Sequence, residues 1–210
     1  MILLTFNQSL YISLAIVGVL IILLLLAIFF YRNYYKKKHL NKVVGHHLYR
    51  FANLNDYLLL NNYRIHIDDN HIGQIDHILI TNKFIIIIND FQYSGVISGD
   101  YSHAELKLTN KKGSMTIVNP LNYNINLTKR IAMFNNLDNT FLRGVVVIND
   151  DSIIDVANLP KQFRIVAKKD INKTIKEFDS ADVKPFKEET IVQFINILDK
   201  KNEKVIRHEK

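Results

Sequence analysis

The side chains in this sequence that can do chemistry are carboxylates and histidines rather than thiols. Asp76 stands in an apolar run, Ile75 to Ile80, and a carboxylate oxygen there is the kind of hard ligand that Mg²⁺ prefers. Five histidines fall in the same part of the chain: His46, His47, His66, His71 and His77. A transition-metal site built from His46 or His47 with Asp76 is one chemical alternative. The chain has no cysteine, which excludes disulfides, thiolate metal clusters and a cysteine nucleophile.

Other catalytic patterns are weaker. Glu105-Leu106-Lys107 spells a Glu-x-Lys motif, but Leu106 shares an apolar face with Ala104 and Leu108, so we expect Glu105 and Lys107 to face solvent. No two histidines have the i, i+4 spacing of a helical zinc motif, and His66 and His71 are five residues apart around an expected turn at 68–70. The sequence contains no glycine-rich phosphate loop and no nucleophile elbow around a serine.

The elements that must position these residues can be read from hydrophobic periodicity. Alternating or continuous β-branched runs predict strands, and periodic apolar residues predict helices. Strands are expected at 63–68, 74–80, 84–89, 106–109, 114–118, 141–148 and 163–167, and helices at 43–62, 122–137 and 187–200. Four consecutive isoleucines, 85–88, indicate a central strand that is covered on both faces. This order predicts an α/β fold in which one mixed sheet is flanked by helices.

Several of these motifs together resemble the nuclease-related domain (NERD) family. They are Gly45 at the start of the first helix, the Ile75 to Ile80 strand, Tyr93-Ser94-Gly95, Asn119-Pro120-Leu121 and the apolar strand 142–148. The resemblance covers residues 43–170. It implies a restriction-endonuclease-like fold and metal-dependent cleavage of a nucleic-acid phosphodiester, and many members carry a transmembrane helix.

The resemblance also implies which residues would form the site. In such a site an Asp and a Glu on neighbouring strands hold Mg²⁺, and a Lys two residues after the Glu helps to position the attacking water. Asp76 matches the Asp, but Asn89 stands in place of the Glu and Phe91 in place of the Lys. The family's glutamate after Gly45 is His46, and its glutamine after Asn-Pro-Leu is Tyr123.

We therefore expect no catalytic residues, with Asp76, Asn89 and Phe91 as vestigial positions, and no cofactor or metal. Asp76 is a weak candidate metal ligand, and Mg²⁺ enters only if the domain is a working nuclease with an atypical site around Asp76. Asp90 is the nearest other carboxylate. It lies one residue away from the Glu position, so strand alternation puts it on the opposite face unless a bulge intervenes.

The N-terminal part of the chain predicts a membrane anchor. Residues 10–31 are uncharged, and 22 residues at about 1.5 Å each make a helix of roughly 33 Å, enough to cross a bilayer. The apolar run is too long for a cleaved signal peptide, and no basic residue precedes it. Five basic residues follow the run at the expected headgroup level: Arg32, Lys36, Lys37, Lys38 and Lys42. By the positive-inside rule we expect residues 1–9 outside and everything after the span in the cytoplasm.

Subtracting the anchor changes the meaning of the net charge of +7. Residues 1–42 hold five of the 27 basic residues and none of the 20 acidic ones, so the remainder carries 22 basic against 20 acidic, or +2. Bulk charge therefore gives little support for nucleic-acid binding. We expect a basic juxtamembrane segment at 32–42, a NERD-like domain at 43–170 and a helical extension at 171–210.

The sequence thus predicts a single-pass protein of the cell membrane, whose cytoplasmic domain is a catalytically inactive NERD-like binding or scaffold module. Its partner is open between nucleic acid and protein. Two alternatives stay open beside it: the metal-dependent nuclease with an atypical site around Asp76, and a plain envelope component that only packs against other proteins.

Overall fold

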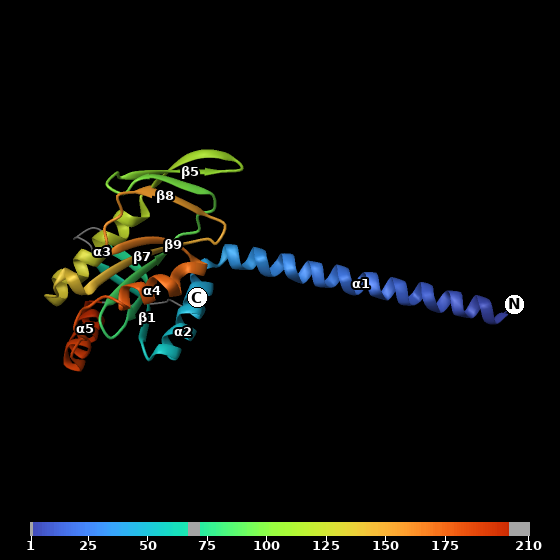
Figure 1. The fold of residues 1–210 in the computed structure, drawn as a ribbon, viewed down its shortest axis with the longest axis horizontal. Helices are drawn as coiled ribbons and strands as arrows, with labels where there is room; N and C mark the ends of the chain where they lie inside the picture. Colours follow the sequence, from blue (N-terminus) through green and yellow to red (C-terminus); the bar gives the residue numbers. More distant parts are fainter. Residues whose placement is uncertain (1, 67–71, 202–210) are drawn as a thin grey trace, which may run out of the picture. The chain divides into compact units, whose positions relative to one another are not determined.

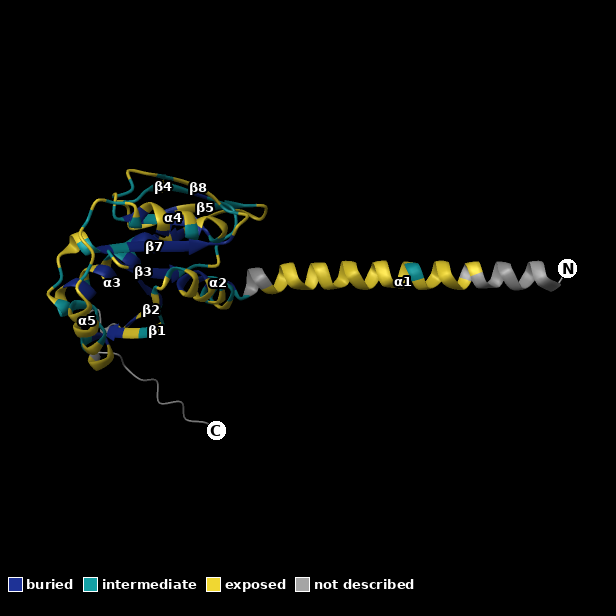
Figure 2. Cartoon of the chain, turned by 60° about the horizontal axis from the view of Figure 1, so that its bottom comes forward, coloured by how far each residue is buried: buried dark blue, intermediate teal, exposed yellow. Residues whose placement is uncertain are grey.

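The structure is a computed structural model that describes residues 2–66 and 72–201, and the chain divides into two compact units, Met1–His39 and Leu40–Lys210. The first unit is one long helix, α1 (Ile2–Lys38). Within the described residues, one stretch is long and apolar enough to cross a membrane, Ser13–Tyr35, and it is not buried by the rest of the protein (Figure 2). Apolar side chains at the surface of a helix of this length suit a lipid environment.

The second unit is built on a five-stranded sheet with the order β1-β2-β3-β7-β9. Its strands are β1 (Leu58–His66), β2 (Ile72–Ile80), β3 (Ile85–Asp90), β7 (Leu142–Ile148) and β9 (Phe163–Ala167). β1, β2 and β3 pair antiparallel, whereas β3, β7 and β9 pair parallel. The sheet is therefore mixed, as the sequence predicts. The four isoleucines of β3 are all buried, because this strand is in the middle of the sheet and is covered on both faces (Figure 2).

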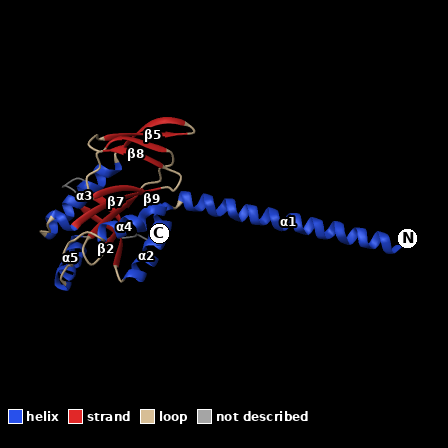
Figure 3. Cartoon of the chain, in the orientation of Figure 1, coloured by secondary structure: helices blue, strands red, loops and turns tan. Residues whose placement is uncertain are grey.

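Helices cover both faces of this sheet (Figure 3). They are α2 (Leu40–Asn55), α3 (Pro120–Asn135), α4 (Ile171–Asp179) and α5 (Glu188–Lys201). Apolar residues of α2 and α4 pack with Leu79, Ile86 and Ile88 in one cluster. Residues of α3 and α5 pack with Ile78, Ile85 and Ile87 in a second cluster, on the opposite face. Two short 3-10 helices, η1 (Asn139–Phe141) and η2 (Lys168–Asp170), precede β7 and α4.

The α/β fold class with helices flanking mixed sheets is confirmed, but the prediction of a single sheet is wrong. A second sheet has the order β6-β5-β4-β8 (Figure 1). Its strands are β4 (Val96–Asp100), β5 (Glu105–Asn110), β6 (Gly113–Val118) and β8 (Ile153–Ala157). One face of this sheet packs through Ile97, Leu106 and Ile117 into a third cluster that includes Val146 and Ile148 of β7. The chain leaves β3 and changes sheet at Gly95, whose φ of 130° suits glycine.

The helix predicted at residues 43–62 is shorter in the structure. Residues 43–62 were expected to be helical, but α2 ends at Asn55, Asp56 takes a left-handed φ of 56°, and β1 begins at Leu58. Leu58 to Leu60 fit a helical apolar pattern, yet they pair with Ile78 to Ile80 of β2. Tertiary pairing therefore overrides local periodicity here. β1 ends at His66, and the expected turn at 68–70 lies outside the described residues.

The helix that follows the second sheet has clear local determinants. Asn119 caps α3 by accepting a hydrogen bond from the backbone N–H of Leu121, and Pro120 occupies the first turn. Asn136 closes the helix in the left-handed conformation with a φ of 50°. These caps fix where α3 crosses the large sheet, and α3 carries two side chains, Tyr123 and Asn124, that contact the candidate site.

Candidate functional site

The carboxylate of Asp76 lies at the centre of a polar network formed by residues of α2, β2 and β3. Its Oδ1 accepts hydrogen bonds from the side-chain amides of Asn41 at 2.9 Å and Gln74 at 3.1 Å. Its Oδ2 accepts from the backbone N–H of Asp90 at 2.9 Å and from Nδ2 of Asn89 at 3.4 Å. A carboxylate has about four acceptor positions. The four protein donors therefore account for all the hydrogen bonds that the carboxylate of Asp76 can accept.

The position of Asp76 in β2 follows from a local break in strand pairing. Asn61 pairs with His77 and Tyr63 pairs with Ile75, but Asn62, which falls opposite Asp76, takes a left-handed φ of 59°. Asp76 is thus at the point where the ladder to β1 is interrupted. Its carboxylate accepts from Asn41 at the start of α2, from Asn89 and Asp90 of β3, and from Gln74 of β2 itself.

Asn89 is fully buried, and its orientation is determined by its neighbours. Its Nδ2 donates to the backbone carbonyl of Gln74 at 2.9 Å, and its Oδ1 accepts from Nδ2 of Asn124 at 3.0 Å. Asn124 is oriented in turn, because its amide also donates to the carbonyl of Ile87. These backbone acceptors force the NH₂ group of Asn89 towards Asp76. The side chain at position 89, which the resemblance to the NERD family aligns with a metal-binding glutamate, therefore presents a hydrogen-bond donor to Asp76.

The close approach of α3 that delivers Asn124 depends on a glycine in β7. A Cβ at Gly144 would lie 2.1 Å from Oδ1 of Asn124 and 2.4 Å from a ring carbon of Phe163. A side chain at position 144 would therefore force the side chains of Asn124 and Phe163 to move. The contact of Asn124 with Asn89 is thus built into the packing of the domain.

Phe91, which the resemblance aligns with a lysine of the family, belongs to an aromatic cluster. Its ring stacks on Tyr93 at a centroid distance of 5.7 Å and meets Tyr123 edge-on at 6.2 Å. The hydroxyl of Tyr123 donates to the carbonyl of Gln74 and accepts from the N–H of the same residue. Burial, together with the charge of Asp76, raises the pKa of Tyr123 against the opposing effect of the Gln74 hydrogen bond. Tyr123 is therefore a neutral hydrogen-bonding group at neutral pH.

A second polar cluster, made of Asn61, His77 and Asp90, lies on the α2 face of the same strands. Nε2 of His77 lies 2.9 Å from Oδ2 of Asp90, and its Nδ1 lies 2.6 Å from Oδ1 of Asn61. Gly45 of α2 faces this imidazole, since a Cβ there would be 3.0 Å from Cε1 of His77. The side chain of Asp90 thus points away from that of Asp76, as strand alternation predicts, and no bulge brings it into the site.

The carboxylate of Asp90 is buried, which is unusual for an aspartate. Its side chain is 1% exposed, and its Oδ1 has no hydrogen-bond partner. Burial raises the pKa of Asp90, while the contact with His77 lowers it and the nearby charge of Asp76 raises it further. The side chains of His77 and Asp90 are buried, with His77 against Gly45 of α2, whereas Asn61 is exposed.

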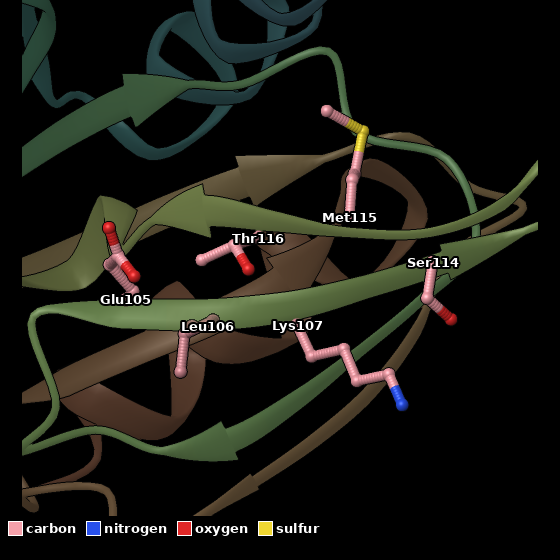
Figure 4. A pocket seen from close by; sticks show the side chains of 6 residues that line it. All are labelled: Glu105, Leu106, Lys107, Ser114, Met115 and Thr116. Atoms are coloured by element: carbon pink, nitrogen blue, oxygen red, sulfur yellow. The ribbon is translucent and has the colours of Figure 1, made fainter.

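The Glu-x-Lys sequence in β5 lies on the second sheet, away from the catalytic positions. Glu105 and Lys107 are exposed while Leu106 is buried, as predicted. Together with residues 114–116 of β6 they line a shallow hollow of about 450 Å³ (Figure 4). Glu105 is the only acidic residue in this lining. A single carboxylate on an open surface does not make a metal-dependent catalytic site.

The histidine hypothesis finds no structural support. His46 is exposed, His47 is half-buried, and no group of three His, Asp or Glu side chains suitable for a metal exists among the residues for which the structure describes side chains. His71 lies outside the described residues, and nothing is described of the His66 side chain. The acidic and amide groups around Asp76 do not fit Mg²⁺, since the amides point their NH₂ groups at the carboxylate.

Sequence reasoning identified Asp76, Asn89 and Phe91 but missed Asn41, Gln74 and Asn124. Gln74 was within reach, because it lies two residues before Asp76 and so shares its side of the strand. Asn41 comes from α2 and Asn124 from α3. Nothing local to either segment reveals that these two helices cross the same strands.

Comparison with known proteins agrees with this architecture. The sequence model of the nuclease-related domain matches residues 36–149, which is more than half of the chain. The chain therefore belongs to the NERD family. Among curated proteins and among solved structures, none gave a match.

Proposed function

We propose that this NERD-family protein is a membrane-anchored binding or scaffold module that does not hydrolyse nucleic acids. The observation that carries the proposal is the set of four protein donors on the carboxylate of Asp76. A metal bound there would have to displace at least one of them. It would gain no second carboxylate, because Asn89 offers a neutral amide whose oxygen already accepts from Asn124.

The chemistry of hydrolysis is also unsupported at the other positions. Phe91 cannot donate to a water or a phosphate oxygen, and its ring is engaged by Tyr93 and Tyr123. Removing one electrostatic catalytic group commonly reduces a rate by about 10²–10³. With Asn89 in place of a carboxylate and Phe91 in place of a lysine, we expect almost no hydrolysis at this site.

The membrane anchor in this proposal rests on α1. Its stretch Ser13–Tyr35 is long and apolar enough to cross a bilayer, and basic residues follow it in the sequence. The excess of Lys and Arg on the C-terminal side favours a cytoplasmic location for the NERD domain. The partner is a macromolecule that the anchored domain holds near the membrane.

The experiment is a cleavage assay on the purified full chain with Mg²⁺ or Mn²⁺ and single- and double-stranded DNA and RNA. Asp76→Asn, which keeps the shape of the side chain, is the matched control. We expect equal background from both proteins. Cleavage by the wild type that disappears in Asp76→Asn would overturn the proposal and establish a metal-dependent nuclease with an atypical site.

Binding is tested separately, by titrating labelled nucleic acid at several salt concentrations. Phosphate contacts make the logarithm of the binding constant fall linearly with the logarithm of salt. The residues after 42 carry a net charge of only +2, so we expect weak binding with a shallow slope and a protein as the partner. A steep slope with tight binding would instead identify the domain as a nucleic-acid tether.

A further inference from the structure

The outward side of α2 is a strip of basic, aromatic and aliphatic residues. α2 buries Leu40, Val44 and Leu48 against the large sheet, each with an exposed fraction of 1% or less. The residues on its other side are exposed, and we call them the outer face of α2: Lys42, His46, Tyr49, Arg50, Asn53 and Leu54. Tyr49 is 57% exposed and Leu54 is 85% exposed. These are high values for large apolar side chains next to a well-packed core.

The charge of this helix has one sign. Leu40–Asn55 contains no Asp or Glu, while Lys42 and Arg50 project from the outer face. α5, by contrast, carries Glu188, Glu189 and Asp199. A basic helix face that also presents a tyrosine and a leucine has the composition of surfaces that lie at a lipid interface, where the aromatic and aliphatic groups enter the headgroup boundary.

Covalent connection keeps this helix near the membrane if α1 spans it. The candidate span ends at Tyr35, and α2 begins at Leu40. Only four residues separate them, so Tyr35 and Leu40 can be at most about 18 Å apart even when the chain is fully extended. α3 is also free of acidic residues and carries Lys129, but 84 residues separate its first residue from Tyr35, so no such limit applies to it.

We infer that the outer face of α2 rests on anionic lipid headgroups of the leaflet from which the chain emerges. The inference depends on the membrane anchor in the proposed function, and it adds a lipid class and a docking surface. Lys42 and Arg50 attract the negative surface, and Tyr49 and Leu54 enter its apolar boundary. Contact through α2 would hold the NERD domain in one orientation at the membrane instead of leaving it to rotate on its tether.

The absence of cysteine makes a direct test possible, because each variant carries a single introduced thiol. Full chains with Leu24→Cys, Tyr49→Cys or Met133→Cys are labelled with an environment-sensitive fluorophore. They are reconstituted in phosphatidylcholine vesicles with or without phosphatidylglycerol and with a spin-labelled lipid as quencher. Leu24 lies within the span, and Met133 is exposed on α3, so they report insertion and the background level of contact.

We expect strong quenching at position 24 in both membranes. At position 49 we expect quenching at least about twofold above that at position 133, and only when phosphatidylglycerol is present. No quenching at position 24 would reject the membrane anchor itself. Quenching at position 24 with equal values at positions 49 and 133 would reject the α2 inference and leave the anchor intact.

Charge reversal provides an independent arm. Lys42→Glu with Arg50→Glu changes two exposed residues of the outer face, and Lys129→Glu makes the same kind of change on α3. The double variant should lose the lipid-dependent quenching at position 49, whereas Lys129→Glu should retain it. Far-ultraviolet circular dichroism checks that all variants are folded. Retention of the full quenching by a folded double variant would contradict the role of charge and overturn the inference.

Discussion

Nδ2 of Asn89 lies 3.4 Å from Oδ2 of Asp76, so an amide donor and a carboxylate meet where a metal-dependent nuclease needs two carboxylates. The amide cannot turn around, because its other contacts are the carbonyl of Gln74 and the amide of Asn124. This contact is the geometric basis for our proposal that Asp76 binds no metal.

Asn89→Asp should convert this contact into a metal-dependent one. The new carboxylate would face Asp76 and would lose the hydrogen bond to Gln74, so we expect a loss of about 2–4 kcal/mol in the free energy of unfolding without divalent ions. Mg²⁺ or Mn²⁺ should restore part of that loss, because two neighbouring carboxylates bind the cation. Thermal unfolding with and without Mn²⁺ measures both effects. Asn126→Asp, at an exposed position of α3, is the control.

A metal-induced rise in Tm for the wild type as large as that for Asn89→Asp would show that Asp76 already binds metal. A neutral effect of Asn89→Asp in metal-free buffer would show that the buried contact between residues 76 and 89 is not the one described here.

The start of the soluble unit gives a second prediction. Leu40 is 1% exposed in the core, and Asn41 donates to Asp76, so both belong to the domain although they precede the boundary at residue 43 expected from the sequence. We expect a fragment of residues 40–210 to be a soluble, cooperatively folding α/β protein. A fragment of residues 43–210 should be less stable by about 2–4 kcal/mol, because a buried leucine and a donor to a carboxylate are lost. Urea unfolding of the two fragments compares them, and equal midpoints would contradict this assignment.

Much of the fold could be predicted from the sequence because several signals are local. The four isoleucines of β3 require a strand that is covered on both sides, and Asn119-Pro120 marks the start of α3. The end of α2 and the division into two sheets were not predictable in this way. The apolar run Leu58 to Leu60 fits the period of a helix as well as that of a strand. Its pairing with β2 decides that it forms a strand.

The same limit applies to the candidate site. Alignment of motifs places Asp76, Asn89 and Phe91, and alternation along a strand separates Asp90 from Asp76. It cannot show that Asn41 reaches Asp76 from a segment 35 residues earlier, or that Asn124 orients Asn89. Those contacts depend on how α2 and α3 pack on the sheet, and the contact of Asn124 also uses the space left at Gly144.

The buried carboxylate of Asp90 predicts a pH-dependent difference in stability. The pKa of Asp90 is raised in the folded state, mainly by burial. A raised pKa means that this group favours folding when protonated. Its contribution is fully present below the unfolded pKa of about 3.9 and is lost as the pH rises through the folded pKa. Asp90 therefore contributes less to folding stability at pH 8 than at pH 4.

Asp90→Asn removes this charge and leaves an oxygen that can accept from His77. We expect the variant to be more stable than the wild type by about 1 kcal/mol at pH 8, with a difference that shrinks as the pH falls towards 4. Denaturant unfolding at both pH values gives the result, and Asp155→Asn at an exposed position is the control. A difference that grows on acidification would mean that the pKa of Asp90 is lowered in the fold.

Topology can be tested in cells. If the basic residues after the span stay in the cytoplasm, a reporter that works only in the cytoplasm should be active when fused after Lys210. A silent cytoplasmic reporter together with an active external one would reverse the orientation. Recovery of the protein in the soluble fraction would remove the anchor from the proposal.

The most direct measurement of the central claim is calorimetric titration of Mn²⁺ into the wild-type protein and into Asp76→Asn. Because four donors already satisfy the carboxylate of Asp76, we expect no site in the wild type tighter than a Kd of about 1 mM, and no difference between the two proteins. A wild-type Kd in the micromolar range that is lost in Asp76→Asn would contradict the account and show that Asp76 is a working metal ligand.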